Sequence, residues 1–174
     1  MSISEDGLRK NQANFASLSP LSFLERTRKT FPNQTAIEYK DYKLSYKQAG
    51  QRCDALANLI KNQNFNSGST IAVMLPNIPV MWECHFGVPM AIGVLNAINT
   101  RLDSHTVQFI LEHGEAKLFI YDSEYSPIVE KALENLKNPP TVIEFVDEVA
   151  GNKRSNFANK VNCLDYETEL KNFI

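Results

Sequence analysis

The sequence predicts an α/β fold with a mainly parallel sheet, flanking helices and an N-terminal β-hairpin. Short apolar runs of strand length alternate with helix-length segments between residues 70 and 145, which is the pattern of βαβ units. Within this region, residues 69–101 read as a strand, a crossover helix and a second strand, the unit from which parallel sheets are built. Two short β-prone segments before the first long helix predict the hairpin. We expect right-handed crossovers in the sheet.

The first part of the chain is expected to hold an arm, two helices and the hairpin. Residues 1–19 lack sustained periodicity and are expected to form a flexible arm. Ser19-Pro20 opens a helix, because a proline in the first turn loses no hydrogen bond, and Pro32 ends it. Ser45 and Gln48 form a capping box that starts a long helix. The expected elements are a helix over residues 20–31, strands over 35–39 and 42–44, and a helix over 45–64.

The next part of the chain is expected to alternate strands with helices. Asn77 is expected to cap the helix that follows the first buried strand, with Pro79 in its first turn and Gly93 after its end. Asp103 or Ser104 is expected to cap the following helix. The expected strands cover residues 70–75, 94–98, 118–121 and 141–145, and the expected helices cover 77–91, 103–114 and 126–138.

The chain is predicted to contain one α/β subdomain, over residues 20–146. A chain of 174 residues can bury one core but is short for two ordinary domains. Residues 147–160 are polar and without pattern, and we expect a loop or a linker there. Residues 164–173 predict a short helix. We interpret residues 147–174 as a loop and a short helix that lead to a remainder missing from this sequence.

Composition and charge exclude several classes of protein. Hydrophobic residues make up 43% of the chain and charged residues 22%, as in globular proteins. The net charge of -2, with both signs interspersed, argues against a nucleic-acid partner, which needs a clustered basic face. The polar start of the sequence has no apolar h-region, so we expect no secretory signal there, and no apolar run reaches the roughly 18 residues of a transmembrane segment. Three cysteines without CxxC spacing disfavour disulfides and zinc, so we expect a cytoplasmic location.

The sequence predicts no catalytic, cofactor-binding or metal-binding residue in this chain. Cys84 and His85 are adjacent on a predicted helix and point about 100° apart, so they cannot form a nucleophile and its base. His105 and His113 have no cysteine or carboxylate in ligand register. The pair at positions 112 and 115, two glutamates, is expected on solvated helix surface, where nothing shifts a pKa towards acid–base work.

Three segments of the sequence match elements of one enzyme family. Leu44 to Gln48 (LSYKQ) matches an early element that joins a small hairpin to the first long helix. Residues 71–79 (IAVMLPNIP) and 87–101 (GVPMAIGVLNAINTR) are similar to a later strand with its turn and to a helix–glycine–strand element. The chain therefore resembles the N-terminal part of the adenylate-forming enzymes, the family of AMP-forming acyl-CoA synthetases, luciferases and peptide-synthetase adenylation domains. The likeness covers residues 19–122, with a further match at 164–167, and is greatest to the acyl-CoA synthetase branch.

The resemblance implies a function and a few binding residues. Such an enzyme activates a fatty or aromatic acid with ATP and Mg²⁺ to an acyl-adenylate, then transfers the acyl group to coenzyme A. Trp82 and His85 would line the pocket for the acid or for pantetheine, although a core-facing imidazole is the favoured interpretation of His85. Asn99 and Arg101 follow a strand end, where open sheets bind ligands, but a structural ion pair or an exposed position is favoured for Arg101.

The sequence lacks the loop on which the chemistry of that family depends. The family holds ATP with a loop rich in Ser, Thr and Gly, whereas the seven glycines of this chain are scattered and form no phosphate-binding motif. We therefore expect a ligase fragment that is inactive alone, binds no cofactor tightly, and exposes the surface that meets the missing remainder. One alternative is a stand-alone, non-catalytic binding or scaffold module, and a weaker one is a small flavodoxin-like nucleotide binder.

Overall fold

The computed structural model describes residues 15, 18–161 and 163–174. The arm predicted over residues 1–19 therefore lies largely outside the described part. The elements in the first two thirds of the chain are α1 (Pro20–Thr30), β1 (Thr35–Tyr39), β2 (Tyr42–Ser45), α2 (Tyr46–Asn62), β3 (Thr70–Met74), α3 (Pro79–Met90), β4 (Val94–Ala97), α4 (Ser104–His113) and β5 (Leu118–Asp122). The remainder follows as the 3-10 turn η2 (Ser123–Tyr125), α5 (Ser126–Leu133), β6 (Thr141–Phe145), the 3-10 turn η3 (Glu148–Ala150), α6 (Asn156–Lys160), β7 (Leu164–Asp165) and α7 (Tyr166–Lys171).

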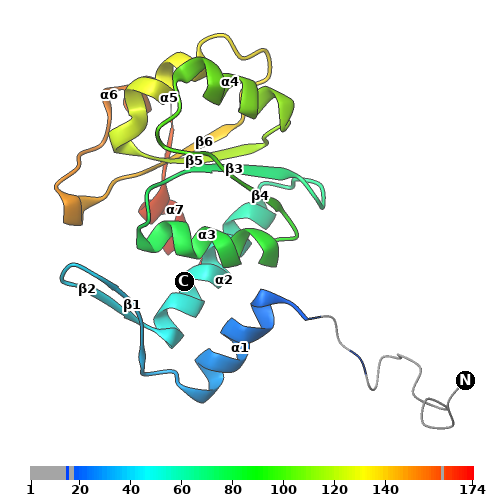
Figure 1. The fold of residues 1–174 in the computed structure, drawn as a ribbon, viewed down its shortest axis with the longest axis vertical. Coiled ribbons are helices and arrows are strands. Elements are labelled where there is room, and N and C mark those ends of the chain that lie inside the picture. The colour runs from blue at the N-terminus through cyan, green and yellow to red at the C-terminus, as the bar shows by residue number, and fades with distance from the viewer. Residues whose placement is uncertain (1–14, 16–17, 162) are drawn as a thin grey trace, which may run out of the picture.

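The predicted fold class is confirmed. Five parallel strands form one sheet in the order β4-β3-β5-β6-β7, and β1 pairs with β2 in a separate antiparallel hairpin. Helices α4, α5 and α6 cover one face of the sheet, and α2, α3 and α7 cover the other (Figure 1). Helix α1 and the hairpin lie beyond the second helical layer. Among the helices formed by the described residues, none is long and apolar enough to cross a bilayer.

Alternate residues of the central strands fill two separate cores. Ile71 and Val73 point towards α2 and α3, whereas Ala72 and Met74 point towards α4 and α5. Every residue of β5 is buried, because helices cover both faces of the strand and other strands flank it. The near-continuous apolar runs in the sequence are thus explained by burial on both sides.

The helix caps predicted at Ser45 and Asp103 are confirmed, whereas the one predicted at Asn77 is not. Ser45 accepts a hydrogen bond from the Gln48 backbone while the Gln48 side chain accepts one from the Ser45 backbone, which confirms the capping box. Asp103 caps α4 through the Thr106 backbone N–H. The prediction that Asn77 caps α3 is wrong, because Ile78 occupies the cap position and makes no side-chain cap bond.

The prediction for the C-terminal segment is wrong in part. Residues 147–160 are not a simple loop, since they contain η3 and α6. Leu164 and Asp165, which were predicted to start the short helix, instead add a fifth parallel strand to the sheet beside β6, and the helix begins at Tyr166. Residues 164–171 therefore pack on the subdomain, and α7 lies in the same helical layer as α2 and α3.

The turn from α3 to β4 forces a branched residue into the left-handed region. Ile92 has φ of 59° and its side chain is 64% exposed. A non-glycine residue in this region costs about 1–2 kcal/mol, and the exposed side chain offers little packing in return. The neighbouring Gly93 has little room for a side chain, because an added Cβ would lie 3.1 Å from Val88 Cγ1 and 3.2 Å from Ile71 Cγ1.

Replacing Ile92 with glycine is expected to stabilise the protein. The relieved strain outweighs the entropy that glycine adds to the unfolded chain, for a net gain of roughly 0.5–1 kcal/mol. Urea denaturation followed by circular dichroism measures the difference. Ile92→Ala is the control, because it removes the same exposed side chain but keeps a Cβ in the left-handed region. Equal stabilities of the two variants would contradict the strain argument.

Candidate functional site

A cavity of about 440 Å³ opens at the carboxyl ends of the strands, between the hairpin, the start of α3 and α7. Tyr39 and Tyr42 of the hairpin form one wall, and Thr168 and Lys171 of α7 form another. The ends of open parallel sheets are where such folds bind ligands. The floor of the cavity includes Arg52, whose side chain is only 13% exposed.

Arg52 lies between two carboxylates from different helices. Its Nε donates to Glu83 Oε1 at 2.5 Å, and its Nη2 donates to Glu167 Oε1 at 2.5 Å. Nη1 and Nη2 complete the two forks, with 3.0 Å to Glu167 Oε2 and 3.2 Å to Glu83 Oε2. The Tyr166 hydroxyl, fully buried, donates to Glu83 Oε2 at 2.8 Å. The planar guanidinium thus serves two carboxylates in bidentate geometry.

Burial sets the charge properties of this group. Glu83 is 0% exposed, and its burial raises its pKa, while the charge and hydrogen bonds of Arg52 counteract the shift. Burial works against the Arg52 charge, but hydrogen bonds to Glu167 and the charge of Glu83 raise the Arg52 pKa overall. Arg52 and Glu83 therefore form a buried ion pair, in which each charge offsets the cost of burying the other.

A second set of buried acids lies at the ends of β5 and β6. Asp147 caps η3 and accepts a hydrogen bond from the Tyr39 hydroxyl at 2.7 Å, which raises the pKa of Tyr39 to about 12. Glu144 accepts from the Tyr121 hydroxyl at 2.9 Å and from the Ser155 backbone. Asp122 Oδ2 and Ser123 Oγ are buried without a hydrogen-bond partner among the described residues. These acids tie the hairpin and the 146–155 segment to the sheet.

Trp82 and His85 line a separate, mostly apolar groove of about 670 Å³ between the hairpin, the start of α1 and α3. The ring of Trp82 lies 4.6 Å from that of Phe86, centroid to centroid. His85 is exposed, and its Nδ1 lies 2.9 Å from the Met81 carbonyl oxygen. The favoured interpretation of a core-facing imidazole is therefore wrong, because this side of α3 faces the groove instead of the sheet.

Asn99 and Arg101 do not join Trp82 and His85. They lie in the exposed turn after β4, where Asn99 Oδ1 accepts a hydrogen bond from the Arg101 backbone N–H at 3.0 Å. Neither residue lines the apolar groove. The structure thus divides the four predicted pocket residues into two pairs, and Arg101 is an exposed surface residue, as favoured from the sequence.

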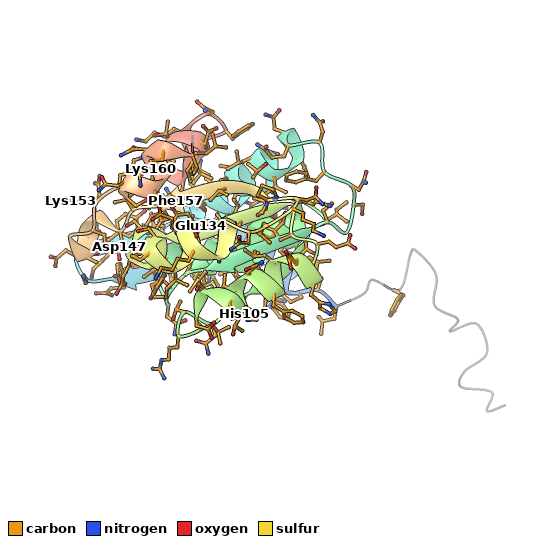
Figure 2. The ribbon with its side chains drawn as sticks, turned by 90° about the horizontal axis from the view of Figure 1, so that it is seen from above. His105, Glu134, Asp147, Lys153, Phe157 and Lys160 are labelled. Carbon is orange, nitrogen blue, oxygen red and sulfur yellow. The ribbon has the colours of Figure 1, made fainter. Side chains whose placement is uncertain are left out.

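The other histidines and the cysteines lie apart. Cys84 is fully buried while His85 is exposed, so the two side chains do not face each other, as predicted. His105 projects from α4 (Figure 2), and His113 stacks on the exposed ring of Phe109 on the same helix. The described residues contain no group of three His, Cys, Asp or Glu side chains arranged to hold a metal ion. Glu112 and Glu115 are exposed, as predicted.

A third hollow lies on the opposite side of the sheet from α3. Glu134, Phe157 and Lys160, labelled in Figure 2, line an apolar groove of about 560 Å³ beside α5 and α6. Cys163 lies at its base, and burial raises its pKa to about 11, so the thiol is not activated. The groove therefore lies on the face of the sheet that α4, α5 and α6 cover.

Sequence reasoning missed Arg52 and the charged residues that it contacts. Glu83 was visible as one of few polar residues in an apolar helix, and a buried carboxylate of this kind requires a cation. The partner was not visible, because Arg52 lies 31 residues before Glu83 and 115 before Glu167. Only the assembled helices bring the three side chains together.

Comparison with known proteins defines the class. The family model described as AMP-binding enzyme matches residues 24–169. The chain belongs to this family of AMP-forming, adenylate-forming enzymes, whose members use ATP, Mg²⁺ and CoA in the full enzyme. The predicted resemblance is therefore confirmed.

The similar proteins are CoA ligases that are much longer than this chain. Acetate–CoA ligase CCL3 of Humulus lupulus is 35% identical over 173 residues, covering 95% of this chain and 30% of the ligase. The peroxisomal trans-cinnamate:CoA ligase of Petunia hybrida is 44% identical over 131 residues, covering 75% and 23%. The crystal structure of anthranilate CoA ligase AuaEII with anthranoyl-AMP superposes with a TM-score of 0.79 at 17% identity, covering 94% and 30%. The chain thus spans less than a third of these relatives.

Proposed function

We propose that the protein to which this chain belongs is an AMP-forming acid–CoA ligase, and that this chain forms its N-terminal part. The observation that supports the proposal is the family match over residues 24–169, together with the short span of the chain on each full-length relative. The reaction would convert a carboxylic acid, ATP and CoA into acyl-CoA, AMP and pyrophosphate.

The proposed substrate is a fatty or aromatic carboxylic acid. Relatives are named for acetate, butyrate, benzoate and trans-cinnamate, which spans short aliphatic and aromatic acids. The apolar groove with Trp82 and His85 is the proposed contribution of this chain to the acid or pantetheine pocket. Asn99 and Arg101, at the carboxyl end of β4, are proposed to face the same region in the whole enzyme.

The chain alone is proposed to be inactive and to bind no cofactor tightly. Its glycines are too scattered for a phosphate-binding loop. Exposed apolar side chains are proposed to mark the contact with the rest of the enzyme. They include Ile92 at 64%, Phe109 at 59% and Val94 at 53% exposure, the last on the edge strand β4.

We also propose a cytoplasmic location for the protein. Fluorescent tagging tests it against a peroxisomal location, which the names of several relatives give for those proteins.

Two assays test this proposal. Purified 174-residue protein is expected to form no acyl-CoA from ATP, CoA and acetate, butyrate, benzoate or cinnamate. The protein encoded by the extended reading frame is expected to form acyl-CoA and AMP with at least one of these acids. Activity of the 174-residue chain would refute the predicted inactivity. A stop codon directly after Ile174, with stable soluble expression, would favour the stand-alone module over the ligase.

A further inference from the structure

Helix α7 is too short to be stable by itself. It has six residues, Tyr166–Lys171, and isolated helices of this length do not form in water. Tyr166 and Leu170 are fully buried among residues of α2, α3 and the sheet. Tyr166 packs edge-on against Phe145, with centroids 5.8 Å apart. The apolar contacts explain why α7 lies on this face of the sheet.

The polar contacts of α7 with the long helices converge on the Arg52–Glu83 pair. Arg52 of α2 binds Glu167 of α7 with one fork and Glu83 of α3 with the other. Tyr166 reaches the same Glu83 through its hydroxyl. Three helices that are distant in sequence are therefore joined through the guanidinium of Arg52.

We propose that Arg52 is the positioning residue of helix α7. It neutralises the buried Glu83 and forms a bidentate ion pair with Glu167, and it thereby holds α7 in place as a wall of the cavity at the carboxyl end of the sheet. The inference concerns the packing of this chain and stands independently of the proposed ligase function.

The surroundings of Glu83 explain why the cation is required. The titratable groups that face it are Tyr42 from β2, Arg52 and Cys53 from α2, Cys84 from α3, and Tyr166 and Glu167 from α7. Of these groups, only Arg52 carries a positive charge. Without it, a fully buried carboxylate would face a second carboxylate and neutral groups, which forces either a proton onto Glu83 or the opening of α7.

Because Glu83 must either bind a proton or lose its contact with α7, the docking of α7 in a variant without Arg52 should depend on pH. Burial already raises the Glu83 pKa, and removing Arg52 raises it further, because the charge and hydrogen bonds that lower it are gone. An acid whose pKa is higher in the docked state binds more protons there than in the open state. In Arg52→Met, docking of α7 is therefore strongest at acidic pH and weakens as the pH rises towards the raised pKa of Glu83.

Hydrogen exchange followed by mass spectrometry tests the proposal on the 174-residue chain. In Arg52→Met at pH 7, protection of amides in Tyr166–Lys171 is expected to fall about 10–100-fold, as for the loss of hydrogen bonds to charged groups. Protection in β3 and β5 should change less. After correction for intrinsic exchange rates, the loss should be smaller at pH 5. Arg28→Met is the matched control, since Arg28 also bridges two carboxylates, but these are Glu25 of α1 and Asp54 of α2 and neither belongs to α7.

Two further variants separate positioning from general destabilisation. Arg52→Met/Glu83→Gln is expected to recover much of the α7 protection and to lose the pH dependence, because the glutamine amide still accepts from Tyr166 without a buried charge. Arg52→Lys is expected to recover part of it, since an ammonium supplies the charge without the double fork. Uniform loss of protection across all elements in Arg52→Met, or no recovery in the double variant, would overturn the proposal.

Discussion

Replacing Glu83 with alanine lowers the free energy of unfolding by about 3–5 kcal/mol, as for other buried ion pairs that lose one partner. The substitution leaves Arg52 largely buried with half of its hydrogen bonds, and it leaves the hydroxyl of fully buried Tyr166 without its acceptor. Chemical denaturation at pH 7, followed by circular dichroism, measures the loss.

Two control substitutions show how much of the lost stability comes from the buried network around Glu83. Glu83→Gln keeps an acceptor for Tyr166 and a similar volume, so it should cost less than alanine. Glu112→Ala, at an exposed position of α4, should change stability by less than about 0.5 kcal/mol. An alanine effect at Glu83 as small as that at Glu112 would show that the buried network adds nothing to stability.

Replacing Gly87 with alanine lowers the free energy of unfolding by about 1–3 kcal/mol, the usual cost of overpacking a core. Gly87 of α3 lies against Leu56 of α2, and an added Cβ would lie 2.8 Å from Leu56 Cδ2 and 3.0 Å from Leu56 Cβ. Leu56 is itself fully buried and cannot swing away. The two helices would have to separate, which also strains the Arg52–Glu83 contact between them.

A double-mutant cycle with Leu56→Ala tests this account. Leu56→Ala alone should cost about 2–5 kcal/mol, because it opens a cavity. In the double variant the new methyl group occupies part of that cavity, so the two losses should sum to more than the measured loss. Strict additivity would mean that Gly87 is not limited by Leu56.

Local patterns were readable in the sequence because their causes lie within a few residues. Ser45 and Gln48 satisfy each other's backbone groups across one turn, and Pro79 needs only its own ring to favour a helix start. The apolar runs of β3 and β5 mark burial on both faces whatever their neighbours are. These signals were enough for the hairpin and the parallel sheet.

What the sequence could not give depends on distant partners. Leu164 and Asp165 form a strand only because the edge of β6 is free to pair with them, and two residues carry no periodicity. His85 was expected in the core because its helix is apolar, yet its outer side meets a groove made by the hairpin. Arg52 is one of many charged residues on a helix until α3 and α7 bring their carboxylates to it.

The placement of the cysteines gives the protein an intrinsic reporter of its own opening. Cys53 and Cys84 are fully buried between α2 and α3, and Cys163 is 7% exposed near α6 and β7. A thiol reagent reacts with the thiolate, so each site is protected until its surroundings separate. The labelling rate of Cys163 then reports the release of the C-terminal segment, while that of Cys53 and Cys84 reports separation of the two central helices. One alkylation time course, read residue by residue, therefore gives the order in which the layers come apart.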